Sequence, residues 1–420
     1  MKYRLMTVLL LMLCLLFSGA AAQTLPDLNV FSPGLTQMSE KLERGEQVEM
    51  TAELAVRDML YARDLSLLQA MLDGMQLVYS GGGTLREGCD ALKLIRSGET
   101  LFAADLVRNG LNAELSVNDR TFGLCLPEGF SGIAAAGDWI SGEAILNRVP
   151  LISVCEAVEG LKAGEPLTAG FVVTAPFAVE RTMSDDGTRL TKIHISSSVE
   201  REGEIWAVSG FLRQPAGRAP KDTAEITFAR DEDNTLTATY SSTRSQSVSQ
   251  KDKKGRVIVE TALSLSGKLG GYGVTTKLKL RMQNDWTADG ENLTEKLVMT
   301  VTLGHTDRTP GRRMQRLNDA SAKLRCEMTV KSQDAAKAPV LIDEKSSLSV
   351  VFDGNTFLDV SVEGDVQVGG EARLAALAGV PVSSKEEIGA AFETAAERIA
   401  GMIYPQLGRE AVSKAENGLE

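Results

Sequence analysis

Alternation of apolar and polar positions with a period of two is the most regular pattern in the chain. Between Val48 and Arg57, apolar side chains at even positions alternate with mostly polar ones at odd positions. Successive side chains of a strand point to opposite faces of a sheet, so this pattern predicts a half-buried strand. The same pattern predicts strands at residues 111–117, 205–212, 224–229, 236–240, 257–269, 272–282, 297–303, 324–330, 348–352 and 357–368.

Short turn sequences separate these segments, which predicts an antiparallel meander. Examples are Asp185 to Gly187, Gly270-Gly271 and Asp353 to Asn355. The alternating segment 272–282 alone would extend roughly 36 Å at 3.3 Å per residue, well beyond a usual strand. We therefore predict a mainly β (α+β) fold: a long-stranded antiparallel meander sheet, curved or sandwich-like, with a few covering helices.

Three segments have the apolar spacing of covering helices. Asp64 is placed to cap a short helix that ends near Gly74, and residues 141–162 form a longer helical pattern that Pro150 should break or kink. Ser384 and Glu387 have the spacing of a capping box, and Pro405 ends the helix that they open. The apolar stripe of this last helix is Ile388, Phe392, Ala395, Ile399 and Met402. Core packing is the expected role of all three helices.

The N-terminus has the three parts of a secretory signal peptide. Lys2 and Arg4 precede a Leu-rich run at residues 6–17, and small residues follow up to Ala22, after which we predict cleavage. The apolar run is shorter than the roughly 20 residues that span a bilayer, although a retained signal anchor is the alternative. Leu13 before Cys14 does not fit a lipoprotein signal. The chain is thus predicted to be secreted or extracytoplasmic, at the cell envelope, with no transmembrane span after cleavage.

The chain divides into four predicted parts. Residues 1–22 are the signal peptide, and residues 23–165 are a mixed α/β part. Residues 166–370 are an antiparallel β-sheet part, which could form one domain with the part before it. Residues 371–420 are a C-terminal helical segment.

The charge of the chain argues against nucleic acid as a partner. The formal net charge is −11 and the sequence pI is about 5.0, so the chain repels phosphate backbones. Two polar connections stand out, residues 241–256 and residues 305–322, and the second holds four arginines. A basic loop could bind an anionic group, and a solvated loop is the alternative interpretation.

Four cysteines follow the predicted cleavage site: Cys89, Cys125, Cys155 and Cys326. Disulfides form outside the cytoplasm, and the candidate pairing is Cys155 with Cys326 and Cys89 with Cys125. Buried free thiols are the alternative. The sequence lacks a Cys-x-x-Cys motif, so it does not favour a zinc knuckle or a thioredoxin-type site.

Motifs for catalysis or cofactor binding are incomplete wherever they begin. His194 and His305 are the only histidines, one expected on the polar face of a strand and the other just after a strand end. Residues 83–88 have the glycine spacing of a phosphate loop without its Lys and Ser or Thr. The segment from Asp231 to Asn234 resembles the start of a calcium loop, but a hairpin turn explains it better. We therefore predict no cofactor and no metal.

These observations favour a non-catalytic protein that binds a hydrophobic small molecule, lipid-like in character, or an envelope protein. Its architecture resembles that of bacterial exported carriers of lipids and lipoproteins, which fold a curved sheet over helices. The candidate apolar cleft is lined by Leu278, Leu280, Met299 and Val301, and a solid core is the alternative. Two further functions remain open: an exported hydrolase that uses paired carboxylates, and a structural cell-surface protein.

Overall fold

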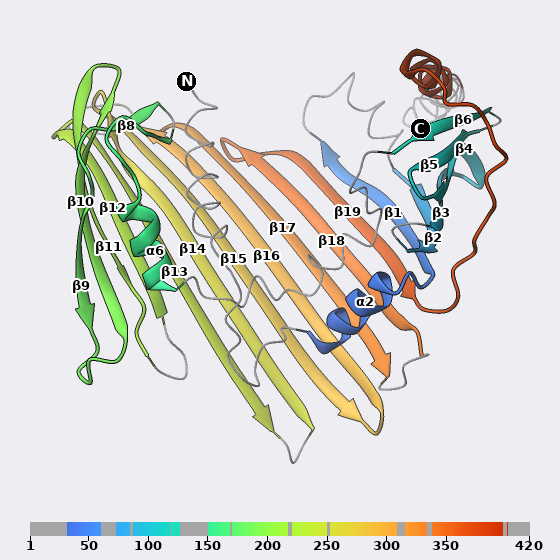
Figure 1. Cartoon of the computed structure of the whole chain (residues 1–420), viewed down its shortest axis with the longest axis horizontal. Coiled ribbons are helices and arrows are strands. Elements are labelled where there is room, and N and C mark those ends of the chain that lie inside the picture. The colour runs from blue at the N-terminus through green and yellow to red at the C-terminus, as the bar shows by residue number, and fades with distance from the viewer. Residues whose placement is uncertain are drawn as a thin grey trace, which may run out of the picture.

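A single antiparallel sheet dominates the computed structural model of the chain (Figure 1). The structure describes residues 32–59, 73–84, 87–118, 120–126, 150–168, 170–216, 221–249, 253–308, 316–333, 338–397 and 401. In these ranges the sheet has 19 strands. The predicted mainly β meander with few helices is confirmed, and of the two predicted shapes the curved single sheet is the one observed.

The strands fall into two consecutive meanders. The first consists of β1 (Val48–Met59), β2 (Met75–Gly83), β3 (Glu87–Arg96), β4 (Glu99–Asn109), β5 (Asn112–Val117) and β6 (Arg120–Cys125). The second begins with β7 (Pro166–Thr168), β8 (Phe171–Val173), β9 (Ala178–Met183), β10 (Leu190–Arg201), β11 (Glu204–Arg213), β12 (Lys221–Asp231) and β13 (Asn234–Ser249). It continues through β14 (Lys254–Leu269), β15 (Tyr272–Asp289), β16 (Asn292–Arg308), β17 (Arg316–Gln333), β18 (Val340–Phe352) and β19 (Asn355–Val368).

Pairing between β1 and β19 joins the two meanders into one sheet. Val48 lies opposite Val368 and Val56 lies opposite Val360, while the other edge of β1 pairs with β2. Strands from residues 23–165 and from residues 166–370 therefore share one hydrogen-bonded ladder. The end strands β2–β6 and β9–β12 are turned out of the plane of the long central strands (Figure 1).

The two faces of the sheet differ in chemistry. One face, which we call the helix face, holds the side chains of Val199, Val257, Leu297, Val330 and Phe122, and it contributes to all four apolar clusters. The opposite face, the polar face, holds residues such as Glu53, Lys279, Thr302 and Lys345, which alternate with the first set. The sheet is thus covered on one side only, as an antiparallel sheet allows.

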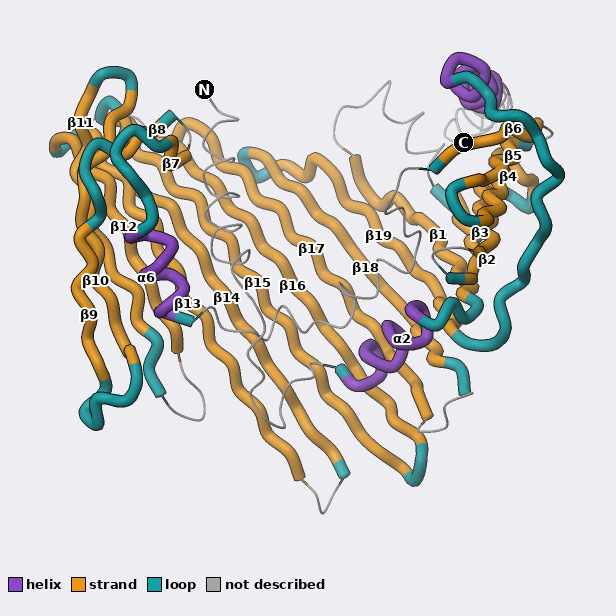
Figure 2. Tube along the Cα trace, viewed as in Figure 1, coloured by secondary structure: helices purple, strands orange, loops and turns teal. Residues whose placement is uncertain are grey.

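The described helices pack on the helix face. Helix α2 (Pro33–Glu43) contributes Leu35, Met38 and Leu42 to the cluster over the central strands (Figure 2). Helix α6 (Leu151–Glu159) packs with Ile193 and Leu212 of β10 and β11. The helix at residues 385–397 packs with Val117 and Phe122 at the other end of the sheet.

Several local predictions can be judged against these elements. The capping box is confirmed, because Ser384 and Glu387 exchange hydrogen bonds. Pro150 is the N-cap of α6. The prediction of polar connections at 241–256 and 305–322 is wrong, because β13, β14, β16 and β17 extend into these ranges. Most side chains in these strand ends are polar, so the alternation that predicts a strand is weak there. The signal peptide, residues 141–149 and residues 65–72 lie outside the described residues.

Candidate functional site

An apolar strip crosses the helix face beside α2. In successive strands from β15 to β19, Leu280 lies opposite Val301, Val301 opposite Leu324, and Leu324 opposite Leu348. In β19 the row reaches Val360, whose next partner is the buried Val56 of β1, and Leu278 and Leu303 form a pair directly beside the row. We define the apolar strip as Leu278, Leu280, Met299, Val301, Leu303, Leu324, Leu348 and Val360.

Every member of the apolar strip is half-buried, in contrast to the closed core under α2. Val330 and Val340, which pack against α2, are 0% exposed. Only Leu280 and Met299 of the strip also pack against that core. The structure thus brings the four predicted cleft residues together on one face, where apolar surface still meets solvent. Their role in ligand binding stays a prediction.

Helix α2 is docked to the sheet through a buried carboxylate. Glu295 of β16 is 0% exposed and accepts hydrogen bonds from the Gly34 backbone N–H at 2.5 Å and from Asn284 Nδ2 at 2.6 Å. Ser32 caps the helix by accepting from Leu35 N at 3.1 Å, and Pro33 follows it at the first turn. A helix N-terminus carries unpaired N–H groups and partial positive charge, which suits a carboxylate. Burial nonetheless raises the pKa of Glu295, against the lowering effect of these donors.

Three polar side chains meet at one end of the apolar strip. Thr276 Oγ1 lies 2.8 Å from His305 Nδ1, and His305 Nε2 lies 3.0 Å from Asp307 Oδ1. Thr276 is opposite His305 in the ladder, so all three side chains project from the helix face. His305 was expected just after a strand end, but it lies inside β16, because this strand continues to Arg308. We call these residues the polar trio.

Gly88, the last glycine of the segment at residues 83–88, lies against an ion pair between Arg108 and Asp90. Asp90 accepts hydrogen bonds from Tyr79 at 2.6 Å and from Arg108 Nε at 3.1 Å. Arg108 is 3% exposed, and its guanidinium fills the space that a side chain at Gly88 would need. Burial and the adjacent Asp90 carboxylate raise the pKa of Tyr79. In a phosphate loop, the space beside the glycines is open to the phosphate. Here the chain's own ion pair of Arg108 and Asp90 fills the space beside Gly88.

A hollow of about 960 Å³ is lined mostly by residues of the polar face. Several of its charged side chains are paired within the sheet: Lys345 contacts Glu363 at 3.0 Å, and Glu53 accepts a hydrogen bond from Gln76 at 3.0 Å. Lys331 contacts Asp343 in the same way at 3.1 Å. The hollow is therefore a solvated, charge-paired surface rather than an apolar cleft.

Carboxylates with displaced pKa values have structural roles. Donors in turns lower the pKa of Asp186 to about 2 and lower that of Asp231. Capping donors lower the pKa of Glu387, and backbone donors from residues 378–380 lower that of Glu114. Each of these acids belongs to a different turn, cap or docking contact. A carboxylate hydrolase needs two such acids in one cleft, and these residues do not provide it.

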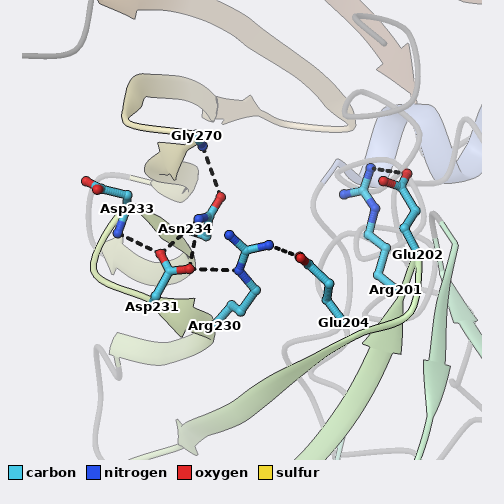
Figure 3. Close-up of polar contacts among 8 residues, drawn as sticks. All are labelled: Arg201, Glu202, Glu204, Arg230, Asp231, Asp233, Asn234 and Gly270. Carbon is cyan, nitrogen blue, oxygen red and sulfur yellow. Dashed lines mark hydrogen bonds and ion pairs between the residues drawn. The ribbon is translucent and has the colours of Figure 1, made fainter.

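The acidic segment after β12 forms a hairpin turn (Figure 3). Asp231 accepts from the backbone N–H of Asp233 at 2.9 Å and from Asn234 Nδ2 at 2.8 Å, and Arg230 pairs with it at 2.8 Å. Asn234 in turn accepts from Gly270 N at 3.0 Å. Because these groups bind one another, the turn explains the resemblance to a calcium loop. Within the described ranges, no group of three or more His, Cys, Asp or Glu residues is arranged to hold a metal ion.

The predicted disulfides are wrong, because all four described cysteines are free. Cys155 lies on α6 against β10, whereas Cys326 lies on β17, seven strands away. Cys89 and Cys125 lie on β3 and β6, about 14 Å apart at 4.7–4.9 Å per strand spacing. A disulfide needs Cα atoms within about 7 Å. Burial raises the pKa of Cys155 and Cys326, which keeps both thiols protonated.

Sequence reasoning missed the residues that organise the site. Glu295 shares a face with Leu297 and Met299, so it breaks the apolar pattern of that face, and its burial follows only from α2 docking over it. Ser32-Pro33 was an available signal for the start of α2. Thr276 and Asp307 are 31 residues apart in sequence, so only the strand register brings them together.

Helices that could cross a membrane are not found in the parts of the chain that the structure describes. No protein-family model and no curated protein sequence matches the chain.

Three solved structures illustrate what the chain is similar to. OccK5 (OpdH) of Pseudomonas aeruginosa is 6% identical, with a TM-score of 0.21, and 78% of this chain and 99% of that chain are covered. OpdK of the same organism with vanillate is 8% identical, with a TM-score of 0.20 and 76% and 96% covered. The outer membrane protein opdK is 8% identical, with a TM-score of 0.19 and 78% and 99% covered. At these TM-scores the likenesses establish neither a family nor a function.

Proposed function

We propose that the protein is a non-catalytic binding protein of the cell envelope whose apolar strip takes up a hydrophobic, lipid-like ligand. One observation carries the proposal: eight half-buried aliphatic side chains lie side by side on the helix face, next to a closed core. Apolar surface gathered in one place and left in contact with water is typical of a binding surface. The envelope location rests on the predicted signal peptide.

The chemistry of the remaining surface supports a binding role. The paired charges of the polar face keep that side in solvent, and the shifted carboxylates are used in caps, turns and docking contacts. Transfer of apolar surface out of water contributes about 25 cal/mol per Å². Each part of the apolar strip that an apolar chain covers therefore adds to the free energy of binding.

Binding of a neutral naphthylamine dye that fluoresces in apolar surroundings tests the proposal. Val301→Asn places an amide in the strip, whereas Thr302→Asn changes the next residue of β16 on the polar face. We expect V301N to weaken dye binding at least about fivefold, because an amide resists transfer out of water. T302N is expected to bind as the wild type does.

Two further measurements complete this test. A native mass of the protein purified from its own compartment should include a bound ligand of several hundred daltons that denaturation removes. N-terminal sequencing of the same sample should begin after Ala22. Equal dye binding by V301N, T302N and wild type would overturn the proposed site.

A further inference from the structure

The polar trio lies where a ligand on the apolar strip would end. Leu303 and His305 are successive helix-face residues of β16, and Leu278 and Thr276 are their direct partners on β15. Successive side chains on one face of a strand are about 6.6 Å apart. A chain lying along β16 from Met299 would thus pass Val301 and Leu303 and reach His305. The imidazole is 34% exposed and the Asp307 carboxyl 23% exposed, so both are accessible from solvent.

Hydrogen-bond geometry decides what the polar trio offers a ligand. The Asp307 carboxylate only accepts hydrogen bonds, so the proton of the neutral imidazole lies on Nε2, which faces it. Nδ1 is then an acceptor, and the Thr276 hydroxyl donates to it. The Thr276 oxygen keeps its lone pairs. The trio therefore offers an acceptor, beside a carboxylate that repels anions.

We propose that the ligand of the apolar strip is an amphiphile with a single long chain and a head group that donates hydrogen bonds, a primary alcohol or amine, held at the polar trio. This inference rests on the proposed function. The aliphatic chain lies on the strip, and the head group donates to Thr276 Oγ1. An acidic head group is disfavoured, because its charge would face the Asp307 carboxylate.

Displacement of the naphthylamine dye by three ligands of equal chain length tests this assignment. Dodecanol, dodecylamine and laurate are titrated against the wild-type protein, and we expect both donors to bind more tightly than laurate. Thr276→Val removes the acceptor with little change of shape, and Thr275→Val makes the same change on the polar face of the same strand. We expect T276V to weaken dodecanol binding about fivefold, the effect of one lost hydrogen bond, and T275V to leave it unchanged.

A second pair of variants separates the head-group site from the strip. His305→Ala should weaken dodecanol binding and leave dye binding unchanged. His194→Ala is the matched control, because His194 is exposed on the polar face of β10. Equal affinity of wild type, T276V and H305A for dodecanol, with the dye still bound, would overturn the head-group assignment alone. If the dye does not bind to the wild-type protein, the proposed function itself is overturned.

Discussion

At the scale of single residues, one glycine and one glutamate hold α2 against the sheet. A side chain at Gly34 would meet Glu295 and would lie 2.7 Å from Val330 Cγ1, closer than carbon atoms pack. Absence of a side chain at Gly34 lets its N–H reach the buried carboxylate. The missing side chain of Gly34 and the hydrogen bond to Glu295 thus both hold the first turn of α2 close to the sheet.

Gly34→Ala should therefore destabilise the protein, although alanine is the better helix former. We expect a loss of about 1–3 kcal/mol in the free energy of unfolding, because the added methyl group forces Glu295 and Val330 apart. Gly389→Ala is the matched control, since this glycine lies in the helix at 385–397 with nothing within 4 Å of an added Cβ atom. It should gain up to about 1 kcal/mol. Urea unfolding of both variants gives the comparison, and equal effects would contradict the docking role.

Glu295 also makes the free energy of unfolding depend on pH, and the direction of its pKa shift fixes the sign of this dependence. Burial raises its pKa above that of the unfolded chain, so the folded state binds more protons between the two values. The free energy of unfolding therefore falls as pH rises through this window. We expect the wild type to show this fall relative to Glu295→Gln in urea unfolding at a series of pH values. Glu387, whose pKa is lowered by Ser384, should show the opposite sign: its contribution is lost as pH falls. A wild-type slope equal to that of E295Q would contradict the effect.

At the scale of elements, the C-terminal segment covers the edge strand β6. Ser383 N donates to the carbonyl of Gly123, and Glu114 accepts from Ala378 N at 2.7 Å and Val380 N at 2.8 Å. The helix at 385–397 then packs on the helix face of the same strands, where Phe392 meets Phe102. The segment thus wraps round an edge that would otherwise offer unpaired N–H and C=O groups.

Glu114→Gln should loosen this wrapping, because an amide replaces one of the two accepting oxygens with a donor. We expect the amide protons of Ala378 and Val380 to exchange faster with solvent, while those of β14–β16 keep their protection. Hydrogen exchange read by mass spectrometry measures both. Glu99→Gln, at the exposed first residue of β4, is the control. Unchanged exchange at 378–380 in E114Q would show that Glu114 does not hold the segment.

Elements with an alternating half-buried pattern could be predicted from the sequence, whereas contacts between distant elements could not. Strands such as β1, β14 and β19 were predicted nearly to their ends because one face is mostly apolar. The ends of β13 and β16 are polar on both faces and looked like loops. The four predicted cleft residues of the strip followed from alternation, but the other four and the polar trio needed the register of the paired strands. The predicted cysteine pairing is wrong because the spacing of two residues in the sequence does not give their distance across a sheet.

At the scale of the whole molecule, the ladder between β1 and β19 makes two meanders interdependent. These strands are separated by about three hundred residues and share eleven paired positions, from Val48 with Val368 to Met59 with Leu358. Contacts of such separation are slow to form, because loop closure must precede them. Each meander alone would expose a long edge strand of high β-propensity, which favours aggregation. The two parts are therefore expected to need each other to stay soluble.

Expression of residues 23–165 and 166–420 as two chains tests this dependence. We expect them to copurify when expressed together and to aggregate when expressed apart, because β1 and β19 each lose one of their two partner strands. Gly364→Val in the second chain should abolish copurification, since an added side chain would lie 3.2 Å from Ala52 Cα. Gly304→Val is the control, because an added Cβ there meets nothing within 4 Å. If both chains are soluble and do not copurify, the meanders fold independently and the β1–β19 ladder is dispensable.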